Sequence, residues 1–140
     1  MIVLDACVLI AHFDETDVFH EDAGTLLRSV AGESLGASPV TLAEVLVGPA
    51  RVGRIDRATA ALAQLEVRTV ALSEDAPVRL AALRAGTSLK LPDCCVLLAA
   101  EQSGGAAVAT FDDRLGAAAR ERGFRVLGWL CGRGLLAFGY

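Results

Sequence analysis

The chain begins MIVLDACVLIAHFD (residues 1–14), and this stretch indicates the fold class. Ile2, Val3 and Leu4 form an apolar run typical of an interior strand in a parallel sheet that is covered on both faces. The strand runs directly into Asp5, although charged residues are rarely buried inside such a sheet. In open α/β sheets, ligands bind in the crevice beyond the carboxyl ends of the strands. We therefore interpret Asp5 as part of a functional site.

The rest of the chain alternates between strand and helix patterns. We expect strands at residues 2–4, 34–38, 66–72, 106–110 and 124–129. We expect helices at residues 6–13, 19–30, 39–48, 52–65, 73–86, 91–105 and 112–123, the last of them exposed. Gly48 and Pro49 are expected to end the third helix, and Ser73 to cap the fifth. Strands separated by helices predict one α/β domain over residues 1–140, with a central parallel sheet of about five strands and helices on both faces.

Length and composition are consistent with one folded domain. The chain has 140 residues, of which 54% are hydrophobic and 21% charged, enough for a buried core. Its longest apolar run, residues 94–100, is much shorter than the roughly 20 residues of a transmembrane helix. The N-terminus has no basic leader and carries Asp5 where a signal peptide needs apolar residues. We therefore expect a cytoplasmic protein with no membrane partner.

The four cysteines are not arranged as a metal or redox site. Cys7, Cys94, Cys95 and Cys131 show neither a C-x-x-C pair nor the spacing of zinc ligands. Three of them lie in apolar stretches. We expect reduced, buried thiols.

The net charge of −4 is unevenly distributed along the chain. Residues 1–50 carry eight acids and one base, a net charge of −7, whereas residues 51–140 carry nine acids and twelve bases, a net charge of +3. A spacing of three places Arg51, Arg54 and Arg57 on one side of an expected helix. A solvated helix face explains this run, and contact of Arg51 and Arg54 with RNA is the alternative.

Four acids occupy positions that composition alone does not explain. They are Asp5 at the end of the first strand, Glu44 within the apolar helix TLAEVLVG, Asp93 at the start of the most hydrophobic helix, and Asp112 after the strand AAVAT. Strand ends and helix starts meet at one edge of a parallel sheet, and the longer side chain of Glu44 can reach that edge. We therefore expect the four carboxylates to converge.

Converging carboxylates indicate a divalent cation. Without a cation they repel one another, and at least one of them has a raised pKa. Mg²⁺ and Mn²⁺ take oxygen ligands from carboxylates and from substrate phosphates, and two such ions about 3.5–4 Å apart promote in-line displacement at phosphorus. The pattern therefore predicts phosphodiester hydrolysis. The predicted catalytic residues are Asp5, Glu44, Asp93 and Asp112, with Asp5, Asp93 and Asp112 as the metal ligands.

Each acid also has a purely structural explanation. Asp93 and Asp112 are both suited to cap the helices that follow them. Glu44 faces solvent if its helix is rotated relative to our expectation. Asp5 is the hardest to explain in this way, because no helix cap requires a charge directly behind a buried strand.

The same stretches of sequence resemble those of the PIN-domain ribonucleases, and specifically the VapC toxins of bacterial toxin–antitoxin pairs. The resemblance covers essentially the whole chain and is carried, in order, by IVLDACVLIA, VTLAEVLVG, LPDCCVLLAA and VATFDDRL. It matches Asp5, Glu44, Asp93 and Asp112 to the metal-binding acids of the family. It also matches Thr110 to a hydroxyl that supports the site. The chain has Ala6-Cys7 where Thr-Ser often follows the first aspartate, so a hydroxyl that usually orients the site is missing.

The resemblance implies a function, a cofactor and partners. It implies a Mg²⁺- or Mn²⁺-dependent endoribonuclease that is toxic unless a VapB-like antitoxin blocks its acidic site. It also implies a homodimer. The alternatives are a non-catalytic PIN-like module that binds RNA or protein and a receiver-type domain. The receiver alternative fits poorly, because Asp5 has no acidic neighbour and no lysine follows the strand AAVAT.

Other candidates are weaker. Lys90, the single lysine, precedes Pro92 and is a further candidate for RNA contact, with a solvated loop charge as the alternative. His12 and His20 are interpreted as structural or surface residues, because a metal-dependent hydrolase needs no histidine base.

Overall fold

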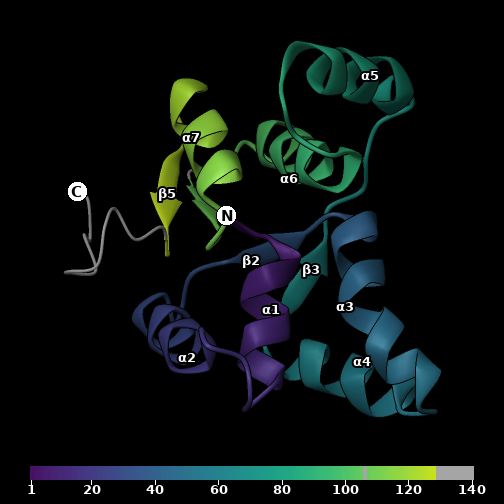
Figure 1. Cartoon of the computed structure of the whole chain (residues 1–140), viewed down its shortest axis with the longest axis vertical. Coiled ribbons are helices and arrows are strands. Elements are labelled where there is room, and N and C mark those ends of the chain that lie inside the picture. The colour runs from purple at the N-terminus through teal and green to yellow at the C-terminus, as the bar shows by residue number, and fades with distance from the viewer. Residues whose placement is uncertain (106, 129–140) are drawn as a thin grey trace.

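A computed structural model describes residues 1–105 and 107–128 (Figure 1). In this part of the chain, five short strands form one sheet in the order β3-β2-β1-β4-β5, and every pairing is parallel. The strands are β1 (Ile2–Leu4), β2 (Leu35–Ala37), β3 (Val67–Thr69), β4 (Ala107–Ala109) and β5 (Arg125–Leu127). The five-stranded parallel sheet is confirmed. The expectations for residues 106 and 129 and for Cys131 lie outside the described residues.

Seven helices are present in the described residues. They are α1 (Ala6–Phe13), α2 (His20–Ser29), α3 (Pro39–Arg51), α4 (Ile55–Gln64), α5 (Ala76–Gly86), α6 (Leu91–Gln102) and α7 (Asp113–Glu121). Figure 1 shows α1 to α4 in the lower half of the view and α5 to α7 in the upper half. The helices therefore cover both faces of the sheet, as the alternation of elements predicted.

Alternation along the short strands creates two cores. Successive side chains of a strand point to opposite faces of its sheet. Ile2 and Leu4 pack in one core with residues of α1 and α2, whereas Val3 packs in the other core with α6 and α7. None of these three residues has any exposed surface. This explains why the first strand is apolar throughout rather than alternating.

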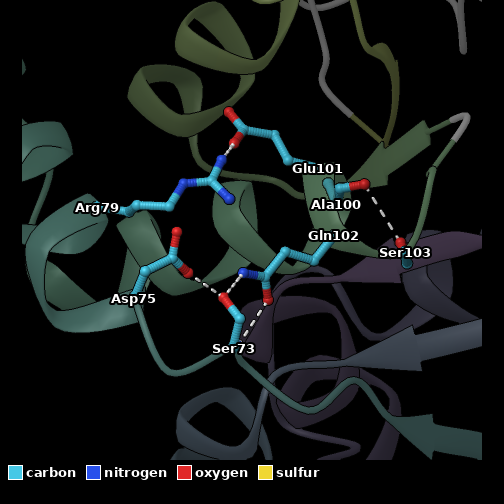
Figure 2. Close-up of polar contacts among 7 residues, drawn as sticks. All are labelled: Ser73, Asp75, Arg79, Ala100, Glu101, Gln102 and Ser103. Carbon is cyan, nitrogen blue, oxygen red and sulfur yellow. Dashed lines mark hydrogen bonds and ion pairs between the residues drawn. The ribbon is translucent and has the colours of Figure 1, made fainter.

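The helix α6 is apolar all round because protein surrounds it. Residues 94–100 are each at most 2% exposed. Figure 2 shows how its solvent-side end is joined to α5: Arg79 forms an ion pair with Glu101, and the side chain of Gln102 contacts Ser73. We expected Ser73 to cap α5, but the N-cap residue is Asp75. The Ser73 hydroxyl donates a hydrogen bond to the Asp75 side chain. Ser73 instead helps to hold the start of α5 against α6.

The boundary between α3 and α4 differs from the expectation. Gly48 and Pro49 do not end α3, which continues to Arg51. The carbonyl of Pro49 accepts hydrogen bonds from the amides of Val52 and Arg54, at 3.2 and 2.8 Å, and these bonds close the helix. The next residue with special backbone geometry is Gly53, whose φ of 70° lies in the left-handed region that favours glycine.

This boundary separates the three arginines. Arg51 lies in the last turn of α3, Arg54 is the N-cap residue of α4, and Arg57 lies within α4. The expectation that they share one face of a single helix is therefore wrong. A turn between two of the three positions breaks the helical periodicity on which that expectation depended.

Two smaller expectations also need correction. The helix α7 is exposed on one face only, because Leu115, Ala118 and Ala119 are buried in the second core. The third strand is shorter than expected, with three residues in β3. The described cysteines are free, as expected, with Cys94 and Cys95 buried and Cys7 partly buried. No helix within the described ranges has the length and apolar character needed to cross a membrane.

Candidate active site

The four acids come from elements that meet at the carboxyl edge of the sheet. Asp5 follows β1 and is the N-cap residue of α1, and Asp112 follows β4 by three residues and is the N-cap residue of α7. Because β1 and β4 are paired, these two turns are neighbours. Asp93 is the third residue of α6, and Glu44 is the sixth residue of α3. The elements that carry these last two acids also contact each other.

A cleft of about 610 Å³ brings three of the acids together. We call it the acidic cleft. It is lined by Glu44, Ser88, Leu89, Lys90, Pro92, Asp93, Phe111, Asp112, Asp113 and Arg114. Asp5 does not line the cleft and is only 8% exposed. Asp5 nevertheless lies next to the cleft, because the Thr110 hydroxyl that donates to its Oδ2 also accepts a hydrogen bond from the amide of Asp112. The predicted convergence is thus seen, with one acid below the surface.

Asp5 is held by three hydrogen bonds. Its Oδ1 accepts a bond of 2.8 Å from the amide of Ala6. Its Oδ2 accepts one of 2.8 Å from the Thr110 hydroxyl and one of 3.1 Å from the Cys7 thiol. Asp5 therefore does serve as a helix cap, contrary to our expectation, because α1 begins directly after the strand. Thr110, which the family resemblance matches to a supporting hydroxyl, thus contacts Asp5 directly.

The structural explanations of Asp93 and Asp112 are compatible with a functional role. The Oδ1 of Asp112 accepts a hydrogen bond of 2.9 Å from the amide of Leu115, which caps α7. The Oδ2 of Asp93 accepts one of 3.3 Å from the amide of Lys90, the N-cap residue of α6. Each carboxylate uses one oxygen in this way. Because a carboxylate has about four lone-pair sites, both residues retain acceptor capacity toward the cleft.

Burial and mutual repulsion perturb the acids. Desolvation raises the pKa of Asp5, Glu44 and Asp93 above their ordinary values. In addition, the Asp5 charge raises the pKa of Glu44 and of Asp93, and the Asp112 charge raises that of Asp5. The positive charge of Lys90 partly opposes this effect at Asp93. The cluster therefore carries more negative charge than the protein compensates.

The donor set suits a hard divalent cation. All four candidate groups are carboxylates, the ligands that Mg²⁺ and Mn²⁺ prefer, and their unbalanced charge favours a cation. Among residues 1–105 and 107–128, however, no three His, Cys, Asp or Glu side chains already stand in an arrangement that could hold a metal ion.

Two basic residues flank the acids. Lys90 lines the acidic cleft, as its candidate role in RNA contact requires, and so does Arg114 in the first turn of α7. Neither side chain forms an ion pair with any described residue. The sequence analysis missed Arg114. Its position two residues after Asp112 in VATFDDRL could have indicated it, because a cap residue and the second residue of its helix lie close together.

A second cavity, of about 640 Å³, adjoins the acidic cleft. We call it the apolar groove. It is lined by Ile10, Phe13, Asp14, Glu44, Val45, Gly48, Pro49, Val52, Arg54, Arg57, Ala58 and Ala61. Glu44 lines both cavities, so the groove leads to the acids. Arg54 lies in the groove rather than in the acidic cleft, and Arg51 lines neither.

The two histidines do not belong to the acidic cleft. The Nδ1 of His20 lies 2.8 Å from the carbonyl oxygen of Ala11 and ties α2 to α1. The Nδ1 of His12 is buried without a hydrogen-bond partner, and the ring packs against Phe13. Burial lowers the pKa of His12. These contacts fit the structural roles expected for both residues.

The protein is thus an α/β domain with an all-parallel sheet and with carboxylates gathered at the carboxyl ends of its strands. The family model of the PIN domain matches residues 2–121. The chain therefore belongs to the PIN domain family, which confirms the resemblance seen in the sequence and excludes the receiver-type alternative.

Solved structures share this fold. A toxin–antitoxin complex from Klebsiella pneumoniae matches with a TM-score of 0.69 and 26% identity, covering 84% of this chain and 91% of that one. VapC20 of Mycobacterium tuberculosis, a toxin that cleaves the sarcin–ricin loop, matches with a TM-score of 0.71 and 18% identity, over 89% and 96% of the two chains. FitAcB of Neisseria gonorrhoeae matches with a TM-score of 0.68 and 23% identity, over 90% and 96%. Comparison with curated proteins gives no significant match.

Proposed function

We propose that this protein is a Mg²⁺- or Mn²⁺-dependent endoribonuclease and the toxin of a VapC-type toxin–antitoxin pair. The observation that carries the proposal is the acidic cleft, where Glu44, Asp93 and Asp112 meet in front of the buried Asp5. Membership of the PIN domain family supports it. The structure from Klebsiella pneumoniae with which the chain shares 26% identity is a toxin–antitoxin complex, which supports the toxin role.

In the proposed reaction, Asp5, Asp93 and Asp112 would hold the cation, which would supply charge stabilisation at the scissile phosphate and activation of water. Thr110 fixes Asp5 through its hydrogen bond to Oδ2. Glu44 takes up a proton more readily than an exposed glutamate, because burial and the charges of Asp5 and Asp93 raise its pKa. It is therefore suited to accept the proton of the attacking water.

Basic residues bind the RNA in this proposal. Lys90 and Arg114 line the acidic cleft and contact the phosphates on either side of the scissile bond. The proposed RNA contacts of Arg51 and Arg54 lie further away, beyond Glu44, so we expect them to contribute less. RNA and a VapB-like antitoxin are both found in the cytoplasm, where we propose that the protein acts.

The antitoxin is proposed to bind the apolar groove. Ile10, Phe13 and Val52 are partly or largely exposed there, and an apolar segment of a partner would bury them. Because Glu44 lines both cavities, a basic side chain on the same segment can reach the acids and block the acidic cleft. Self-association as a homodimer, implied by the family resemblance, completes the proposed assembly.

Mapping the ends of a cleaved oligonucleotide tests the reaction. Attack by activated water leaves a 5′-phosphate and a 3′-hydroxyl and requires the metal. A ribonuclease that used His12 or His20 as general base would instead use the ribose 2′-hydroxyl and leave a cyclic phosphate with a 5′-hydroxyl. We expect the first pair of ends and complete loss of cleavage in EDTA. Cyclic phosphate ends, or cleavage that survives EDTA, contradict the mechanism.

The second candidate function is a non-catalytic PIN-like binding module. The absence of a preformed three-ligand group among the described residues favours it. A ligand that binds only the native state raises the melting temperature by mass action. If Mn²⁺ changes neither the melting temperature nor the cleavage of RNA, the binding module is the better description. Co-expression with the small open reading frame beside the gene then tests whether a protein partner binds.

A further inference from the structure

The position after Ala6 holds a thiol where the family often has a hydroxyl, and the structure shows what this thiol contacts. The Cys7 Sγ lies 3.1 Å from the Oδ2 of Asp5 and donates to it. The same sulfur accepts a hydrogen bond of 3.4 Å from the amide of Phe111, in the turn between β4 and α7. Cys7 therefore links the turn that carries Asp5 to the turn that carries Asp112.

Thr110 makes a parallel link between the same two turns. Its hydroxyl accepts a hydrogen bond of 3.0 Å from the amide of Asp112 and donates one of 2.8 Å to the Oδ2 of Asp5. Both donors to Oδ2 thus accept a hydrogen bond from a backbone amide of the turn between β4 and α7, Cys7 from Phe111 and Thr110 from Asp112. The Cys7 and Thr110 side chains are 3.6 Å apart and each already gives its single hydrogen to Asp5, so neither replaces the other.

We propose that Cys7 is a positioning residue that fixes Asp5 for cation binding and holds it in register with Asp112. The proposal rests on the proposed function, because it concerns the cation site. Side chains that orient metal ligands typically contribute about 10–100-fold to metal affinity.

The test compares two substitutions of Cys7. Cys7→Ala removes the donor and leaves the Phe111 amide without its acceptor, whereas Cys7→Ser keeps a donor and an acceptor at the same place. The readout is the dissociation constant of Mn²⁺, measured by electron paramagnetic resonance, with RNA cleavage as a second measurement. We expect Cys7→Ala to weaken Mn²⁺ binding by about 10-fold, at the lower end of the range for such residues, and Cys7→Ser to restore it to within about twofold.

A neighbouring residue provides the control for lost packing. Val8 is fully buried beside Cys7 in α1 and packs in the first core, and its apolar side chain takes no part in the polar contacts of the site. Val8→Ala is expected to lower the melting temperature while leaving the Mn²⁺ affinity unchanged. A Mn²⁺ affinity that is equal in Cys7→Ala and wild type overturns the inference, as does a Cys7→Ser variant as weak as Cys7→Ala. Wild-type protein that binds no Mn²⁺ overturns the proposed function and this inference with it.

Discussion

The acidic cleft and the apolar groove are similar in volume, about 610 and 640 Å³, and they share Glu44, yet they differ in origin. Asp5 and the acids of the cleft sit at the end of a strand, at the start of helices and one and a half turns into α3, positions that the order of elements brings to one edge of the sheet. The groove is formed by the sides of α1, α3 and α4, whose relative placement depends on the turn around Gly53. The position of the acids thus follows from topology, whereas the shape of the apolar groove follows from helix packing.

The largest effect is expected from Asp93→Asn, which should reduce RNA cleavage by more than about 100-fold, beyond the range for residues that only orient metal ligands. The asparagine oxygen can still accept the Lys90 amide, and the charge that burial disfavours is removed. The melting temperature should therefore hold or rise. Steady-state cleavage and thermal unfolding measure the two effects, and an Asp93→Asn variant with wild-type cleavage would remove Asp93 from the site.

Asp5→Asn should abolish cleavage as well, but it is a less clean test. Both Asp5 oxygens accept hydrogen bonds, from Ala6 on one side and from Cys7 and Thr110 on the other. An amide NH₂ would face a donor whichever way it is turned. Loss of stability is therefore expected beside loss of activity.

A charge in the apolar groove should separate binding of the antitoxin from catalysis. Val52 is 67% exposed and lines the groove. Val52→Asp is expected to weaken the antitoxin complex by about 10-fold, equivalent to about 1.4 kcal/mol. The cleavage rate of the free protein should be unchanged. The dissociation constant of the antitoxin complex is measured by titrating the purified partner into wild type and Val52→Asp. Equal dissociation constants would show that the antitoxin binds elsewhere.

Removal of a phosphate contact should have a smaller effect. Arg114→Ala is expected to raise the KM for RNA a few-fold with little change in kcat, and to reduce the slope of log affinity against log salt by about 1. The control is Arg125→Ala, because Arg125 begins β5 at the opposite edge of the sheet and pairs with Glu33. Equal salt slopes for Arg114→Ala and wild type would argue against a phosphate contact.

The smallest effect is the pH dependence of stability in EDTA. The native state raises the pKa of Asp5, Glu44 and Asp93, so it binds protons more tightly than the unfolded state does. Stability from these groups therefore falls as pH rises from their unfolded pKa, about 4, through the raised native values. The drop in melting temperature between pH 4 and pH 7 should be smaller in Asp93→Asn than in wild type. An equal drop in the two proteins would show that the charge of Asp93 does not destabilise the native state.

The sequence was sufficient to predict most of the acidic cleft. Asp5 and Asp112 stand at the ends of apolar strands, and Asp93 opens a helix that is apolar all round. In a parallel sheet, chain direction alone brings strand ends and the following helix starts to one edge. The burial of Asp5 below the cleft was not predicted, because it involves packing against distant residues such as Thr110, which lies 105 residues further along the chain and donates a hydrogen bond to Asp5.

By itself, the sequence determined the order of strands and helices, the two apolar cores and the edge at which the carboxylates gather, because hydrophobic periodicity and chain direction are properties of local sequence. Only the tertiary structure decided that Arg54 lies in the apolar groove, that Arg114 flanks the acids, and that the Cys7 thiol donates a hydrogen bond to Asp5. These contacts join residues on different elements. Their geometry depends on helix boundaries and side-chain packing, which no local pattern specifies.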